Sequence, residues 1–161
     1  MDTNKEYIQI MIESLRKKNE VLDRLIELNR QQKFMLQNPN LSPQEFEQNM
    51  QYKSEQVEQL NTLDEGFEQL FSNVREELDQ NRELYADEIH QMQDNIRKIT
   101  EKVNTIQTQE IRNKASVENK FTDIRRQVKG VRNSQRVVKQ YYDNMMSHRN
   151  AGAASVIDNK K

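Results

Sequence analysis

The chain has 161 residues, of which 34% are apolar and 32% charged, with three glycines, two prolines and no cysteine. The missing cysteine excludes disulfide-stapled folds, and the scarcity of glycine and proline argues against strand architectures, which need many turns. The apolar content is too low for a multilayered globule, but it suits a thin bundle in which each helix buries about two residues in seven. We therefore expect a single all-α domain.

The net charge of −1 hides an uneven distribution of charged residues. Residues 1–80 hold 9 Lys/Arg and 16 Asp/Glu, whereas residues 111–149 hold 10 and 3. Such an asymmetry bears on partners more than on fold. The sequence contains no run of about 18 apolar residues, and its start is amphipathic, so it predicts neither a membrane span nor a signal peptide. A cytoplasmic protein is the expectation.

The first predicted helix runs from about residue 4 to residue 37. Its apolar seam repeats at helical spacing through Ile8, Met11, Leu15, Leu22, Leu25 and Leu36. Polar residues interrupt this seam at Lys18, Asn29 and Gln32. The helix should end at Asn38-Pro39-Asn40, because proline disfavours a helical residue before it and asparagine tolerates turn geometry.

The second predicted helix, residues 43–80, has the clearest start in the chain. Ser42-Pro43-Gln44-Glu45 combines a capping serine, a proline at the first helical position and a glutamate three residues after the cap. Gly66 lies inside the helix, where it either costs about 1 kcal/mol relative to alanine or permits a close helix contact. The apolar spacing slips after Leu78, which places a turn near residues 80–86.

The third predicted helix, residues 86–147, is much longer than the others. It contains no proline and only one glycine, Gly130, and its seam continues from Ile89 to Met145. One continuous helix of this length would be roughly 90 Å long. With short connections, the three helices form an elongated antiparallel three-helix bundle or coiled coil with a long, overhanging C-terminal helix.

The antiparallel register brings polar interruptions of the three helices to one height. If the two turns centre near residues 40 and 83, the residues that meet are Asn29, Lys53, Gln56, Glu110 and Asn113. We expect a polar layer there, including a Lys53–Glu110 pair, because such layers can fix register at some cost in stability. The alternative is chance overlap in a polar sequence.

The same register leaves residues 118–147 without an intramolecular partner, because the second helix begins opposite residue 123. An uncovered apolar stripe usually marks an interaction surface. The predicted partner-binding residues are Phe121, Ile124, Val128, Val131, Val138, Tyr141, Tyr142 and Met145. Basic residues around them would steer a partner: Arg125, Lys129, Arg132 and Arg136. Residues 148–161 are expected to be a flexible tail.

Catalytic and metal sites are not expected. The chain has only two histidines, His90 and His148, and they lack the paired acid-x-x-His elements of di-iron bundles. No glycine-rich phosphate loop, nucleophile elbow or Ser/His/Asp set is present. The sequence therefore predicts a protein that is not an enzyme and has no cofactor.

The basic segment 111–149 leaves two further partner classes to consider, a nucleic acid and an anionic membrane surface. Its basic residues lack the grouping of a bZIP-type region, and apolar seam residues run through it. The seam is narrow and the chain has no tryptophan, which disfavours a membrane-surface helix. Binding of nucleic acid or of a regulator stays an alternative rather than the main prediction.

Three segments resemble the flagellar type III export chaperones of the FlgN type, which are related in role to the FliT type. These segments are Tyr7 to Lys18, Leu60 to Phe67, and Ser134 to Met146 with its Tyr141-Tyr142 pair. The lysine-rich ending Asp158-Asn159-Lys160-Lys161 is also similar to clostridial members. The resemblance covers most of the chain as a pattern, without a strict single-residue motif.

This resemblance implies a cytosolic chaperone that holds exported flagellar axial subunits, namely hook–filament junction proteins or the filament cap, before secretion. The family binds clients through its C-terminal part, and export apparatus components are further implied partners. We expect a client's amphipathic helix to lie on the predicted stripe. The main alternative is a homodimeric coiled-coil scaffold that associates through the same residues.

Overall fold

The part of the chain that the structure describes folds as four α-helices. The computed structural model describes the backbone of residues 3–124 and 131–149, and the side chains of residues 3–122 and 136–145. The helices are α1 (Thr3–Gln37), α2 (Pro43–Gln80), α3 (Ala86–Ile124) and α4 (Val131–Arg149). The prediction of an all-α helical bundle is confirmed, whereas the expected number of helices was three.

The start of α2 shows how local sequence sets a helix boundary. The Ser42 hydroxyl accepts a hydrogen bond from the backbone N–H of Glu45 at 3.3 Å, and Pro43 is the first helical residue. This cap satisfies a donor that has no partner inside the helix. The helix therefore begins where the capping-box pattern places it.

The connection between α2 and α3 is a compact turn over residues 81–85. The backbone N–H of Asn81 donates to the Glu77 carbonyl at 3.1 Å, and the Asn81 side-chain amide donates to the same oxygen at 3.0 Å. Tyr85 then donates its N–H to the Asn81 carbonyl at 3.2 Å. Asn81 thus ends α2 without the help of a proline or a glycine. It lies within residues 80–86, where the interrupted apolar spacing predicts a turn.

The expected single helix over residues 86–147 is wrong. Helix α3 ends at Ile124, and α4 begins at Val131 and packs against α2. The described residues of the predicted overhang at 118–147 are consequently part of the bundle. The physical reason is that the apolar stripe of α4 loses water-exposed area by folding back onto the bundle of its own chain.

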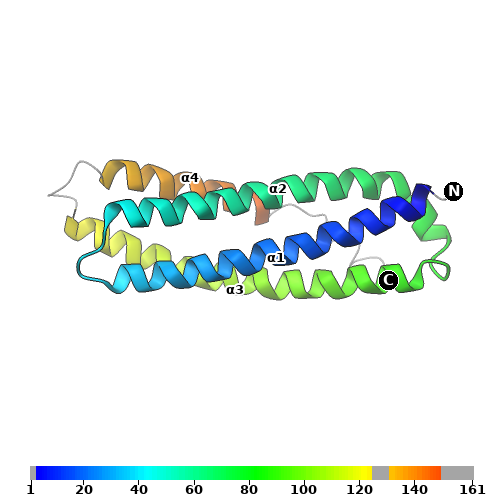
Figure 1. Ribbon diagram of the computed structural model, residues 1–161, viewed down its shortest axis with the longest axis horizontal. Helices are drawn as coiled ribbons and strands as arrows, with labels where there is room; N and C mark the ends of the chain where they lie inside the picture. Colours follow the sequence, from blue (N-terminus) through cyan, green and yellow to red (C-terminus); the bar gives the residue numbers. More distant parts are fainter. Residues whose placement is uncertain (1–2, 125–130, 150–161) are drawn as a thin grey trace.

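The helices alternate in direction along an elongated bundle (Figure 1). Helices α1 and α3 run one way and α2 and α4 the other, and α4 lies beside the first part of α2. Helix α1 packs against both α2 and α3. Since α4 has 19 residues and α2 has 38, the last part of α2 extends beyond the end of α4.

The core follows the predicted seams of α1, α2 and α3. Its buried residues include Ile8, Met11, Leu25, Met50, Val57, Leu60, Val74, Met92, Ile96 and Ile106. Gly66 does not serve a close helix contact, because a Cβ at this position would have no heavy atom within 4 Å. The glycine therefore carries the helix-propensity cost without a packing reason.

Candidate partner-binding groove

A buried ion pair lies at the centre of the half of the bundle that α4 covers. Lys53 Nζ of α2 lies 2.7 Å from Glu110 Oε1 of α3, and Lys53 is fully buried. The Lys53 ammonium also donates to Gln32 Oε1 of α1 at 3.2 Å. Burial lowers the pKa of Lys53, and the Glu110 carboxylate opposes this shift. The predicted Lys53–Glu110 pair is confirmed.

Amide side chains extend this pair into a polar layer. Asn113 of α3 donates to the Asn29 carbonyl of α1 at 3.0 Å, and both residues are buried. Asn49 of α2 donates to the Leu28 carbonyl at 3.0 Å and accepts from Gln32 Nε2 at 2.9 Å. The layer was predicted at this height, although Asn49 was not among its predicted members.

Gln56 does not belong to the polar layer. Its side-chain oxygen accepts a hydrogen bond at 2.9 Å from Arg24 Nε of α1 in an exposed contact. Gln56 follows Lys53 by three residues, which offsets it by about 60° around the helix, and its side chain points to Arg24 of α1. The prediction for Gln56 was therefore wrong, because equal height along a bundle does not mean the same helix face.

The ring of Tyr141 in α4 covers the polar layer at Lys53. The Lys53 ammonium lies 4.2 Å from the centroid of the Tyr141 ring, and Tyr141 is fully buried. The Tyr141 hydroxyl is buried beside the Glu110 carboxylate. Burial, followed by the negative charge of Glu110, raises the pKa of this hydroxyl well above its ordinary value. Tyr141 is thus a core residue and not the exposed partner-binding residue that we expected.

The remaining predicted stripe residues divide between core and groove. Phe121 is 7% exposed and packs edge-on against Phe46 of α2, with ring centroids 5.6 Å apart, so its predicted exposure is also wrong. Val138, Tyr142 and Met145 are partly buried and pack against the core. The side chains of Ile124, Val128 and Val131 lie outside the described residues.

The predicted steering residues are described only in part. The side chains of Arg125, Lys129 and Arg132 lie outside the described residues, whereas Arg136 is exposed on α4. The charges of the helices complement one another: α2 carries ten Asp/Glu and two Lys/Arg, and α4 carries four Lys/Arg and one Asp. The helix with a net positive charge, α4, therefore packs on a helix of its own chain with a net negative charge, α2.

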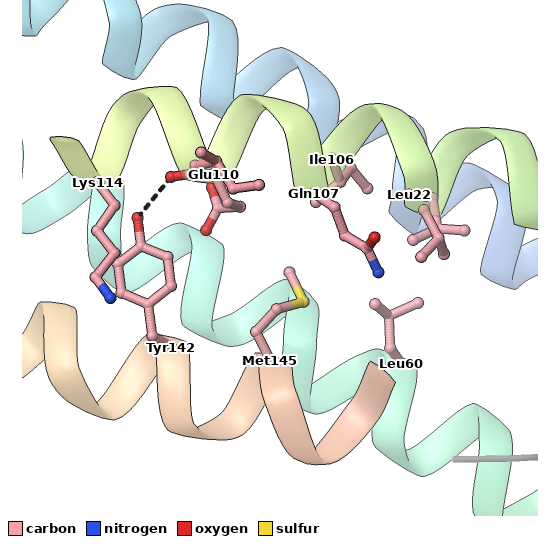
Figure 2. A pocket seen from close by; sticks show the side chains of 10 residues that line it. Leu22, Leu60, Ile106, Gln107, Glu110, Lys114, Tyr142 and Met145 are labelled. Carbon is pink, nitrogen blue, oxygen red and sulfur yellow. Dashed lines mark hydrogen bonds between the residues drawn. The ribbon is translucent and has the colours of Figure 1, made fainter. Parts of the chain in front are cut away.

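An apolar groove opens between α3 and α4. It encloses about 300 Å³ and is lined by Leu22, Leu60, Val103, Ile106, Gln107, Glu110, Ile111, Lys114, Tyr142 and Met145. Figure 2 shows Tyr142 and Met145 projecting from α4 toward α3, with Leu22 and Leu60 beyond Met145. In the described part of the chain, α3 and α4 do not approach each other as closely as α4 approaches α2. The groove follows from this wider spacing.

Tyr142 connects the groove to the polar layer. Its hydroxyl donates to the Glu110 carbonyl at 3.4 Å, as the dashed line in Figure 2 marks, and burial raises its pKa. The Lys114 ammonium lies 5.5 Å from the centroid of the Tyr142 ring. Ile111, on the same wall, is 73% exposed. The groove therefore combines an apolar floor with an exposed isoleucine and a basic residue at its edge.

A second buried ion pair was not predicted. Lys18 of α1 and Asp64 of α2 lie 2.7 Å apart, with side chains 8% and 10% exposed. The sequence predicts Lys18 only as a polar interruption of the first seam. The available signal was that both residues fall on apolar seam positions of adjacent helices.

The described residues contain no group of three or more His, Cys, Asp or Glu side chains able to hold a metal ion. Within the same residues, no helix has the length and apolar character to cross a membrane. The groove presents apolar surface with a few polar groups. Such a surface fits the apolar face of a helix better than it fits a small-molecule substrate.

Comparisons with known proteins returned no match: no family model, no curated protein and no solved structure is similar to this chain.

Proposed function

We propose that this protein is a cytoplasmic flagellar export chaperone that binds an amphipathic helix of an exported axial subunit and shields it before type III secretion. The expected clients are hook–filament junction proteins, with the filament cap as the second candidate. The proposal assigns a binding role and no catalytic step. It combines the sequence resemblance with one structural observation, the apolar groove between α3 and α4.

The groove supports the proposal because its chemistry matches one face of an amphipathic helix. Val103, Ile106 and Met145 supply apolar surface, and Ile111 is exposed at the edge. A partner helix that brings its own apolar residues would remove these side chains from water. Helix α4 is an example of such helix-on-helix packing within the chain, since it packs against α2.

The proposed contact residues differ from those predicted from the sequence alone. Tyr142 and Met145 stay in the set because they line the groove, whereas Tyr141 and Phe121 belong to the core. Ile111 and Val103 join it from α3. Lys114 replaces the predicted basic residues at the edge, where it would favour an acidic side chain on the client.

Affinity should be moderate, because the client helix is disordered before assembly and must become ordered on binding. A chaperone of this kind also has to release its client at the export apparatus. A short apolar contact with few polar groups gives moderate affinity and allows release of the client. A large, fully complementary interface would bind the client too tightly for this.

The test is a single substitution at the most exposed groove residue. Ile111→Glu places a charge in the proposed interface and, since Ile111 is 73% exposed, should leave the fold intact. The probe is a fluorescent peptide covering the terminal helix of the hook–filament junction protein from the same genome, followed by anisotropy. We expect at least a roughly tenfold weaker affinity, the cost of burying an unpaired charge.

Ile10→Glu is the matched control, because Ile10 is 53% exposed on α1 and does not line the groove. This variant should bind the peptide as the unchanged chain does. Equal affinities for the two variants, with unchanged helicity by circular dichroism, would rule out the groove as the client site.

A further inference from the structure

The groove between α3 and α4 has two chemically different ends. Figure 2 shows the Lys114 side chain beside the Tyr142 ring at one end. Leu22 and Leu60 lie at the other end, beyond Met145. We propose that the groove selects a partner helix that carries two large apolar side chains four residues apart and a carboxylate one turn beyond them, which pairs with Lys114. This inference rests on the helix-binding role proposed above and adds the sequence pattern that the partner carries.

The heights of the lining residues give the length of the apolar part of the groove. The Tyr142 hydroxyl donates to the Glu110 carbonyl, so these two residues lie at one height. Because α3 and α4 run in opposite directions, Met145 then lies near the height of Gln107. Val103, the last lining residue of α3 on this side, precedes Glu110 by seven residues. The apolar part therefore spans about two helical turns, or roughly 10 Å.

The volume of the groove agrees with two inserted side chains. The groove encloses about 300 Å³. A cavity of about 150 Å³ with an apolar lining holds one molecule of benzene, so this groove has room for about two side chains of the size of leucine or phenylalanine. Side chains four residues apart lie on one face of a helix, with Cβ atoms about 5–6 Å apart. Such a pair fits within two turns of the groove.

Lys114 supplies the charge at the polar end, one turn beyond Glu110 on α3. Its ammonium lies 5.5 Å from the centroid of the Tyr142 ring, and within the described residues it forms no ion pair, either with Glu110 or with Glu118 one turn further on. The Glu110 carboxylate is instead paired with Lys53 at 2.7 Å. A carboxylate on the partner at this height therefore meets an opposite charge, whereas a lysine there meets a like charge.

The experiment uses a designed fluorescent helical peptide that contains no flagellar sequence. It carries two leucines four residues apart and a glutamate four residues outside each leucine, so that one glutamate reaches Lys114 in either orientation of the peptide. A matched peptide has lysines in place of both glutamates. At low salt we expect the glutamate peptide to bind about fivefold more tightly than the lysine peptide, and this difference should shrink at high salt.

Alanine in place of either leucine should weaken binding of the glutamate peptide at least roughly tenfold, because a buried apolar side chain is then lost. An unchanged affinity after either replacement would overturn the pattern of two inserted side chains. Failure of the glutamate peptide to bind at all would also overturn it.

Charge reversal in the protein tests the role of Lys114. Lys114→Glu should invert the preference, so that the lysine peptide binds more tightly than the glutamate peptide. Lys98→Glu is the matched control, since Lys98 is exposed on the same helix and does not line the groove. This control should keep the preference for the glutamate peptide. A retained preference in Lys114→Glu, or an equal inversion in Lys98→Glu, would overturn the inference.

The result is separable from that of the client test. The junction-protein peptide could lose affinity in Ile111→Glu while the designed peptides show no dependence on Lys114. That outcome overturns this inference and leaves the proposed function standing. Designed peptides that follow the pattern, together with a junction-protein peptide that does not bind, support this inference and count against the flagellar client.

Discussion

The two buried ion pairs have the same length but different surroundings. Lys53–Glu110 and Lys18–Asp64 both measure 2.7 Å between charged atoms. The first joins α2 to α3 beneath the Tyr141 ring of α4, and Lys53 has no exposed surface. The second joins α1 to α2 alone, and its side chains are 8% and 10% exposed. The comparison shows that the Tyr141 ring covers the lysine of the first pair completely, whereas the Glu110 side chain, 8% exposed, is about as accessible as the side chains of the second pair.

This difference predicts the largest effect at Glu110. Glu110→Ala leaves the Lys53 ammonium buried without its counter-charge, and we expect the free energy of unfolding to fall by about 3–5 kcal/mol. Urea denaturation followed by circular dichroism measures this loss. The double variant Lys53→Met/Glu110→Leu should recover most of it, because no buried charge then remains. A loss below about 1 kcal/mol for Glu110→Ala would contradict the described enclosure.

A smaller loss is expected at the second pair. Asp64→Ala should lower the free energy of unfolding by about 1–3 kcal/mol, because the Lys18 ammonium needs only a small movement to reach water. The same urea titration measures it. If Asp64→Ala lowers the free energy of unfolding as much as Glu110→Ala does, the proposed difference between the two ion pairs is wrong.

The smallest effect at neutral pH is expected for Tyr141→Phe, which removes only the buried hydroxyl beside Glu110. The free energy of unfolding at pH 7 should change by less than about 1 kcal/mol, since the ring over Lys53 is retained. The ring-preserving substitution therefore separates the packing of Tyr141 from its hydroxyl chemistry.

The same substitution should show a clearer effect in alkaline solution. The folded-state pKa of Tyr141 is raised above the ordinary value of 10.0, so above pH 10 this hydroxyl ionises more readily in the unfolded chain. Its contribution to stability is therefore lost as the pH rises beyond 10. The stability of Tyr141→Phe should fall less steeply there. Lys53 has a lowered pKa and acts in the opposite direction, but it is present in both proteins. Parallel pH profiles would show that Tyr141 is not buried.

The sequence contained enough information for most of the bundle. The Ser42 cap set the start of α2, and the spacing of polar seam positions placed Lys53 opposite Glu110. These features depend on contacts that are local or that follow from antiparallel register. Gln56 was misassigned because the register gives height along the bundle but not the direction of a side chain.

The place of α4 could not be predicted, because the sequence between α3 and α4 carries no clear turn signal. The seam through Ile124, Val128 and Val131 continues without interruption, and Gly130 is the only glycine nearby. What determines the fold-back is a set of distant contacts, above all Tyr141 with Lys53. The groove could not be predicted either, since it results from the spacing that this fold-back creates between α3 and α4.

The most direct test of the proposed client site is methyl chemical-shift mapping by NMR, with the junction-protein peptide titrated into labelled protein. The account predicts the largest shifts at the methyl groups of Leu60, Val103, Ile106, Ile111 and Met145, which line the groove. The methyl groups of Ile8 and Met92, buried in the core and absent from the groove lining, should not move. Saturable shifts confined to residues outside the groove would contradict the account.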